Sequence, residues 1–124
     1  MDVTPLIPAG RQIIEDYGPG GFKVSGIQFD GPVLVLPERS QAWEVEGFGA
    51  LSERSFDVVI AAEPRPELLL VGSGQRIQLM PSRLRQAVRA HGVVIEVMDT
   101  GAACRTYNVL LGEGRRVAAA LLPA

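Results

Sequence analysis

The side chains most suited to chemistry lie within residues 98–108, which read MDTGAACRTYN. Cys104, the single cysteine, falls in the first turn of a predicted helix, where unpaired amide groups and the helix dipole favour a thiolate. Asp99 precedes it and could act as a general acid or base. Arg105 beside the helix start would suit a carboxylate or phosphate, although an ion pair with Asp99 or Glu113 is an equally ordinary role.

Cys104 and Asp99 each have a simpler structural interpretation. A free cysteine that follows two alanines is typical of a buried packing residue, and Asp99 or Thr100 is suited to capping the helix. A nucleophile also needs a base, and the single histidine, His91, lies at the other end of a predicted strand, roughly 20 Å away at about 3.3 Å per residue. We therefore favour packing for Cys104 and capping for Asp99, and we predict no catalytic residue.

A second candidate is the loop Gly72-Ser73-Gly74, which follows a predicted buried strand at residues 68–71. Its backbone amides could cradle an anion. It lacks the complete dinucleotide-binding fingerprint and the lysine of a phosphate-binding loop, so by itself it is a weak signal.

The elements around both loops predict that they meet. Residues 68–71 read as a strand, Ser82 to His91 as a helix stopped by Gly92, and residues 93–98 as a second strand. Such a βαβ unit is right-handed with parallel strands, so both loops leave the carboxyl edge of one sheet, where open α/β sheets bind ligands. The predicted ligand or partner pocket comprises Gly72, Ser73, Gly74, Arg76, Asp99, Thr100, Gly101, Cys104, Arg105 and Tyr107.

The first half of the chain predicts a layer of β-hairpins. We expect strands at residues 11–17 and 22–29 around the turn at residues 18–21, with a β-bulge at Ser25-Gly26 that keeps one face apolar. Asp30-Gly31 predicts a further hairpin with residues 33–36 as its return strand.

The remaining elements are a short helix from Ser52 that ends before Pro64, a helix at residues 102–111 and a last strand at residues 116–122. The predicted fold class is therefore α/β: one three-layer domain over residues 1–124 around a central mixed β-sheet, with an N-terminal β-hairpin layer and about three helices.

Composition narrows the functional classes. The 124 residues include 47% hydrophobic and 21% charged residues, which is typical of a globular domain. One cysteine and one histidine argue against a metal site, and we predict no cofactor. The net charge of −2 and the scattered arginines argue against nucleic acid, and Arg83, Arg85 and Arg89 are expected to form a solvated helix face. No apolar run reaches the roughly 18 residues of a transmembrane helix, and the N-terminus resembles no targeting segment, so we expect a cytoplasmic protein.

Several motifs resemble a known family. They are PLIPAGRQ at residues 5–12, YGPGGF at residues 17–22, GSG at residues 72–74, MDTGAACRTYN at residues 98–108 and GEGRRVAAAL at residues 112–121. Together they are similar to the small family of unknown function that includes the mitochondrial respiratory complex I assembly factor and its bacterial and archaeal relatives. The resemblance spans nearly the whole chain and implies a three-layer α/β domain around a mixed sheet. It carries over no catalytic residue.

Two functional hypotheses follow, with a third possibility beside them. The resemblance implies a non-enzymatic interaction or assembly factor with protein partners, associated peripherally with a respiratory membrane complex. The alternative is a small-molecule or anion-binding protein, or a latent enzyme, that uses the crevice between the 72–74 loop and residues 99–107. A structural domain that forms homo-oligomers through an apolar patch is the third possibility.

Overall fold

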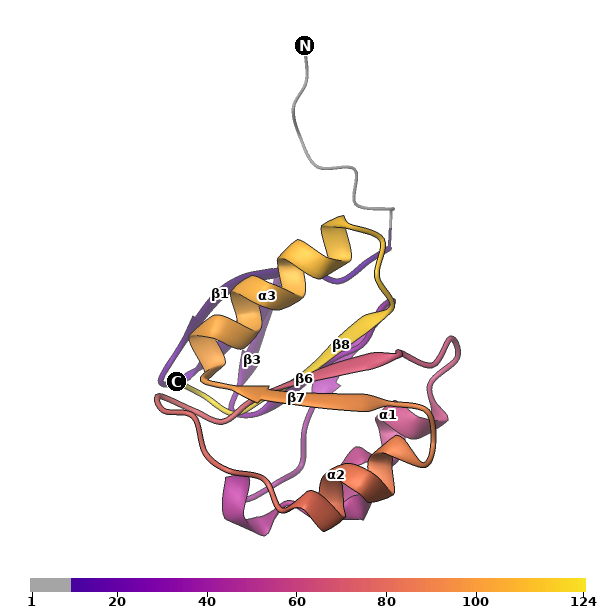
Figure 1. Ribbon diagram of the computed structural model, residues 1–124. Helices are drawn as coiled ribbons and strands as arrows, with labels where there is room; N and C mark the ends of the chain where they lie inside the picture. Colours follow the sequence, from indigo (N-terminus) through magenta and orange to yellow (C-terminus); the bar gives the residue numbers. More distant parts are fainter. Residues whose placement is uncertain (1–9) are drawn as a thin grey trace.

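A five-stranded mixed sheet lies at the centre of the computed structural model, which describes residues 10–124 (Figure 1). The strand order is β5-β4-β8-β6-β7, with β6 parallel to both β7 and β8. The bounds are β4 Val33–Val35, β5 Ser40–Ala42, β6 Leu68–Gly72, β7 Val94–Met98 and β8 Val117–Leu121. The α/β class, the mixed sheet and the parallel βαβ unit are therefore confirmed. The first motif of the family resemblance, which begins at Pro5, lies largely outside the described residues.

One face of this sheet is covered by a small antiparallel sheet and the longest helix (Figure 1). The small sheet has the order β1-β2-β3, with β1 Ile14–Gly18, β2 Gly21–Val24 and β3 Ile27–Asp30. The helix α3, Thr100–Gly112, lies beside it. Because side chains alternate along a strand, Val33 and Val35 of β4 face this layer and pack with buried Phe22 and Tyr107.

The opposite face packs against the shorter helices. These are the 3₁₀ helices η1 (Phe48–Ala50) and η2 (Glu53–Phe56), followed by α1 (Asp57–Ala61) and α2 (Ser82–Arg89). Leu34 and Val71 point toward this side, where they meet buried Phe56, Val59 and Val88. All five residues of β8 are buried, as expected for a central strand covered on both faces.

Two predicted details in the hairpin layer are wrong. The bulge predicted at Ser25-Gly26 is a two-residue turn, with φ 46° and 85°, that joins β2 and β3. The hairpin predicted at Asp30-Gly31 is instead the connection between the two sheets, because β4 pairs with β5 and β8. The hairpin around the turn after Gly18 is confirmed.

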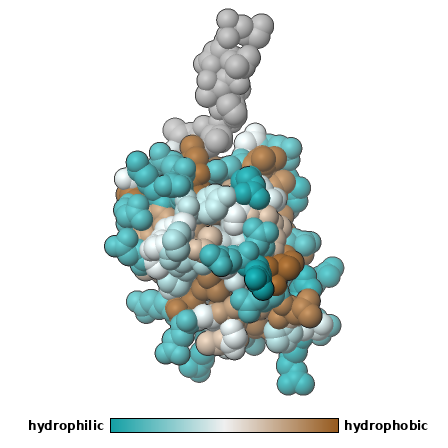
Figure 2. Space-filling view, turned by 90° about the vertical axis from the view of Figure 1, so that its left-hand side faces the viewer, coloured by the Kyte–Doolittle hydropathy of each residue, from teal (hydrophilic) through white to brown (hydrophobic). Residues whose placement is uncertain are grey.

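The surface is mixed in character. The face in Figure 2 is mainly hydrophilic, with smaller hydrophobic areas between the polar side chains. Among the described residues, Ile77 and Leu79 on the loop before α2 are the most exposed large apolar side chains, at 64% and 96%. No helix within residues 10–124 is long and apolar enough to cross a membrane.

Candidate functional site

The loop after β6 and the start of α3 meet at the carboxyl edge of the sheet, as predicted, and hydrogen bonds join them directly. The Ser73 amide donates to the Met98 carbonyl at 2.9 Å, and the Thr100 amide donates to the Gly74 carbonyl at 2.9 Å. Thr100 Oγ1 accepts from the Gly74 amide at 2.8 Å and donates to the Leu122 carbonyl at 2.6 Å. One buried hydroxyl therefore links the loop, the helix start and the end of β8.

The Ser73 side chain stabilises its own loop. The residue is 3% exposed, and its hydroxyl donates to the Arg76 carbonyl at 2.6 Å and accepts from the Gln78 amide at 3.2 Å. Gly72 allows the close approach, because a Cβ atom there would lie 2.9 Å from Thr100 Oγ1 and 3.0 Å from Thr100 Cα. The polar groups of the predicted anion cradle are thus used in holding the two segments together.

Asp99 is the N-cap of α3. Its Oδ1 accepts from the Ala102 amide at 2.9 Å, and its φ and ψ of −61° and 156° are those of extended backbone. The capping interpretation is confirmed, and the helix begins at Thr100, two residues before its predicted start.

Cys104 and Tyr107 lie on the side of α3 that faces the sheet, within the apolar layer that contains Leu70 and Ala119. Cys104 is 2% exposed, and this burial raises the pKa of its thiol from 9.0 to about 12, opposed only by the nearby charge of Arg105. Burial also raises the pKa of Tyr107, whose hydroxyl donates to the Gln12 carbonyl at 2.9 Å. The packing interpretation of Cys104 is confirmed by this burial. A neutral buried thiol is also a poor nucleophile.

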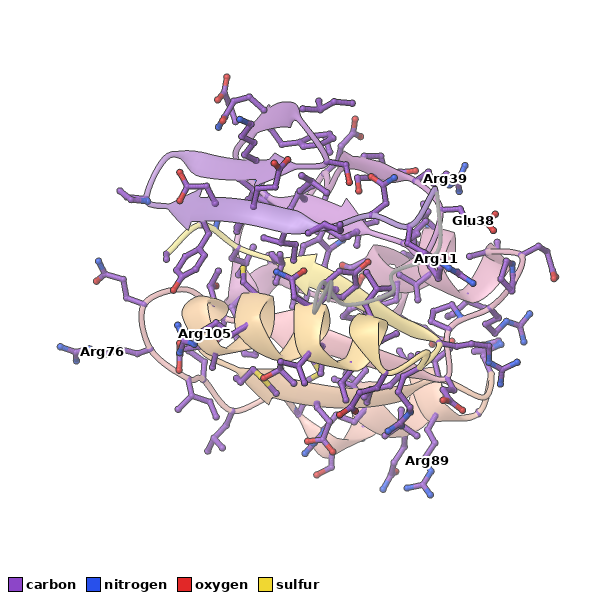
Figure 3. The ribbon with its side chains drawn as sticks, turned by 90° about the horizontal axis from the view of Figure 1, so that it is seen from above. Arg11, Glu38, Arg39, Arg76, Arg89 and Arg105 are labelled. Atoms are coloured by element: carbon purple, nitrogen blue, oxygen red, sulfur yellow. The ribbon has the colours of Figure 1, made fainter. Side chains whose placement is uncertain are left out.

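The arginines lie at the rim. Arg105 Nη1 donates to the Tyr17 hydroxyl at 2.8 Å, so that α3 contacts the end of β1. Gly101 lies beneath this contact, since a Cβ atom there would be 3.0 Å from the same hydroxyl. Arg76 is exposed and points away from the molecule, as Figure 3 shows.

The structure thus brings together the 72–74 loop and residues 99–101, places Arg105 beside them, and separates Arg76, Cys104 and Tyr107 from this junction. Tyr17 and Leu122 complete the junction, and the sequence analysis missed both because they come from distant segments. None of the ten residues of the predicted pocket lines any of five surface hollows on the described part of the chain, although Tyr17 lines one of them. Another of these hollows lies between α2 and β7. At this junction the polar groups of the two segments hydrogen-bond to the chain itself.

Relatives of this chain are known in bacteria and animals. It is 42% identical over 115 residues to an uncharacterized protein of Rhodobacter capsulatus, covering 93% of this chain and 87% of that protein. It is 39% identical over 115 residues to human NADH dehydrogenase (ubiquinone) 1 alpha subcomplex assembly factor 3, covering 93% of this chain and 62% of the human protein. The chain therefore spans about three fifths of the length of the human and rat assembly factors.

A solved structure and a family match are consistent with these relatives. The solution structure of a Bordetella pertussis protein, described as an Mth938-like domain, superposes with a TM-score of 0.82 at 29% identity and covers 99% of this chain and 92% of that one. The family described as a protein of unknown function (DUF498/DUF598) matches residues 14–122. The resemblance inferred from the motifs is therefore confirmed, and the chain belongs to the DUF498/DUF598 family.

Proposed function

We propose that this protein is a non-enzymatic assembly factor that acts by binding protein partners of a respiratory, complex I-like enzyme. The observation that carries the proposal is the alignment with the human assembly factor, which extends over 93% of this chain. We further propose that the protein is cytoplasmic and associates peripherally with the membrane complex.

The state of the candidate site supports binding over catalysis. The hydroxyl groups of Ser73 and Thr100 are both engaged with backbone groups of the chain itself. The Cys104 thiol, the strongest candidate nucleophile in the sequence, is buried and protonated at neutral pH. The reactive and polar side chains of residues 98–108 therefore stabilise the fold, and we propose that partners bind at the outer surface instead.

The proposal is tested by deleting the gene in the organism that encodes the chain. Membranes are then assayed for NADH:quinone oxidoreductase activity, and the assembly state of the enzyme is examined by native gel electrophoresis. Succinate:quinone oxidoreductase activity in the same membranes is the matched control. We expect a specific loss of the NADH-dependent activity with accumulation of smaller assemblies, restored by the wild-type gene. Unchanged activity and unchanged assembly would contradict the proposal.

A further inference from the structure

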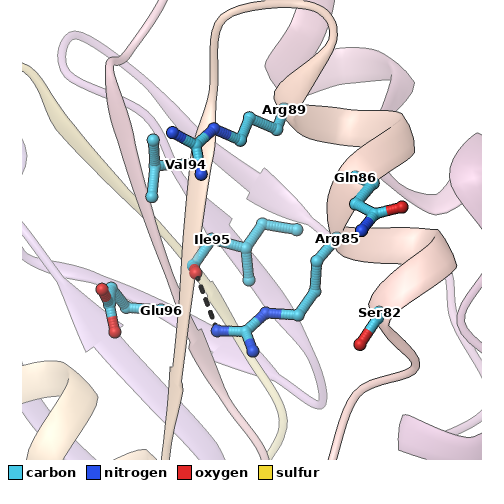
Figure 4. A pocket seen from close by; sticks show the side chains of 7 residues that line it. All are labelled: Ser82, Arg85, Gln86, Arg89, Val94, Ile95 and Glu96. Atoms are coloured by element: carbon cyan, nitrogen blue, oxygen red, sulfur yellow. Dashed lines mark hydrogen bonds between the residues drawn. The ribbon is translucent and has the colours of Figure 1, made fainter.

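The hollow between α2 and β7 differs from the other surface features because it combines an open sheet edge with positive charge. Its volume is about 350 Å³, and Ser82, Arg85, Gln86, Arg89, Val94, Ile95 and Glu96 line it (Figure 4). The sequence predicts a solvated helix face for the arginines of α2. The structure shows that two of them, Arg85 and Arg89, extend from the helix toward the strand (Figure 4).

The outer side of β7 carries backbone groups that no strand of residues 10–124 pairs with, because β7 is the last strand of the sheet. The Val94 amide donates to the Glu67 carbonyl, and the Met98 carbonyl accepts from the Ser73 amide. The backbone groups of alternate residues, beginning at Val94, therefore point toward β6. In a parallel ladder the amide and carbonyl of one residue point the same way. Ile95 and Val97 therefore present theirs outward, toward an added strand.

Arg85 and Arg89 supply charge beside this edge. Arg85 Nη2 lies 3.4 Å from the Ile95 carbonyl, a long contact. Among the ion pairs within residues 10–124, none includes either arginine. Helix α2, with the sequence SRLRQAVR, has no acidic residue, and the one carboxylate that lines the hollow, Glu96, lies on the other face of β7 (Figure 4).

We infer that the open edge of β7 binds an extended acidic segment of a partner protein by strand addition. The backbone of the segment pairs with Ile95 and Val97, and its carboxylates on the α2 side pair with Arg85 and Arg89. The inference rests on the proposed function, since it assigns the surface through which an assembly factor would contact its partner.

The spacing of the two arginines defines the segment. Arg85 and Arg89 are four residues apart on a helix, which corresponds to about 6 Å along its axis. Every second residue of a strand lies on the same face, about 6.8 Å apart. Two acidic residues separated by one other residue therefore match the two guanidinium groups. The residue between them faces Glu96, so it is neutral or basic.

A second copy of the chain fits this edge less well. Antiparallel pairing of two β7 strands about a two-fold axis keeps both α2 helices on the same face of the joined sheets. Arg85 and Arg89 of both copies would then approach each other, and like charges in an interface oppose association. Charge therefore favours an acidic partner.

The test uses a fluorescent peptide in which glutamate alternates with threonine, and a matched peptide in which glutamine replaces glutamate. Binding to the full chain is followed by fluorescence anisotropy at low and high salt, and the site is mapped by the amide NMR signals of Ile95 and Val97. We expect the acidic peptide to bind roughly 2- to 30-fold more tightly than the glutamine peptide, as two exposed ion pairs allow, with a smaller difference at high salt.

The double variant Arg85→Gln/Arg89→Gln should lose this preference. The control Arg76→Gln/Arg83→Gln, which removes the same charge from positions outside the hollow, should keep it. Absence of peptide binding, equal binding of both peptides, signal changes remote from β7, or a concentration-dependent dimer through β7 would each overturn the inference.

The deletion strain separates this inference from the proposed function. If the inference is correct, the Arg85→Gln/Arg89→Gln gene restores NADH:quinone oxidoreductase activity poorly and the control gene restores it fully. Full restoration by both variants overturns the inference alone. A deletion that has no effect on the activity or assembly overturns the proposed function.

Discussion

At Thr100, one hydroxyl group joins three segments that are far apart in the sequence. It accepts from Gly74 and donates to Leu122, and the residue is fully buried. Buried polar groups must be paired, because an unpaired one carries the cost of its lost hydration. Residues 98–108 thus have a structural role, because their polar groups hold the carboxyl edge of the sheet together.

Replacing Thr100 by valine should therefore be costly. The Gly74 amide and the Leu122 carbonyl lose their partner, at about 1–3 kcal/mol for each unpaired buried group. Thr100→Ser keeps the hydroxyl and loses one methyl group, for about 1 kcal/mol. Urea denaturation of both variants measures the difference in the free energy of unfolding. A valine variant as stable as the serine variant would contradict the role of the hydroxyl.

Cys104 gives a prediction with a defined pH range. Its pKa is raised from 9.0 to about 12 in the folded chain, so folding favours the protonated thiol. This contribution to stability is complete below about pH 9 and is lost as the pH rises toward 12. Between about pH 8 and pH 10, the free energy of unfolding of the wild type should fall by about 1 kcal/mol more than that of Cys104→Ala. Equal pH dependence of the two proteins would contradict the raised pKa.

The same burial predicts low thiol reactivity. Iodoacetamide should modify Cys104 rapidly in denaturant and very slowly in the native protein at neutral pH, because only the accessible thiolate reacts. Mass spectrometry of samples taken over time follows the modification. Rapid alkylation of the native protein, increasing with a midpoint well below pH 9, would restore the catalytic interpretation.

Side chains of helix α3 join it by hydrogen bonds to β1 and to the residues just before β1. The Asn108 side chain accepts from the Ile14 amide at 3.1 Å and donates to the Ile14 carbonyl at 2.7 Å. It thereby takes the place of a neighbouring strand at the start of β1. With the Tyr107 contact to Gln12 and the Arg105 contact to Tyr17, α3 fixes the small sheet against the large one.

Asn108→Ala should loosen this attachment. Two backbone groups of Ile14 lose their partner, and we expect the free energy of unfolding to fall by about 1–3 kcal/mol. Hydrogen exchange at the Ile14 amide should accelerate more than exchange in β6. Val109→Ala on the same helix is the control, because Val109 is 59% exposed. Uniform acceleration across both sheets would show that Asn108 has no special role in joining them.

Local signals in the sequence explain which elements could be predicted. The βαβ unit from β6 to β7 has an apolar run, a helix that ends before Gly92 and a second apolar run, and each of these signals is complete within a few residues. Asp99 likewise caps a helix that it directly precedes. These features required no knowledge of distant parts of the chain.

The errors arose where the outcome depends on pairing between strands. Phe22 and Phe29 have opposite parity in sequence, which suggested a bulge, yet the two-residue turn pairs them across β2 and β3 and places them on one face. Asp30-Gly31 has the composition of a hairpin turn, but β4 pairs instead with β8, more than 80 residues later in the sequence. The contacts of Tyr17 and Leu122 at the junction were unpredictable for the same reason.

On the scale of the whole molecule, the layers that cover the two faces of the central sheet differ in how their polar side chains are used. The layer with α3 uses its polar side chains for internal contacts. The layer with α2 presents arginines beside the open edge of β7. Together with the relatives named as assembly factors, this division supports a protein whose function depends on its surface.

The most direct test of this account is native co-purification from the organism that encodes the chain. A tagged chain at its normal expression level is isolated from gently solubilised membranes, and the recovered proteins are quantified by mass spectrometry against an untagged strain. We expect specific recovery of subunits or assembly intermediates of the NADH:quinone oxidoreductase, and we expect Arg85→Gln/Arg89→Gln to reduce this recovery. Recovery of the tagged chain without any of these subunits would contradict this expectation.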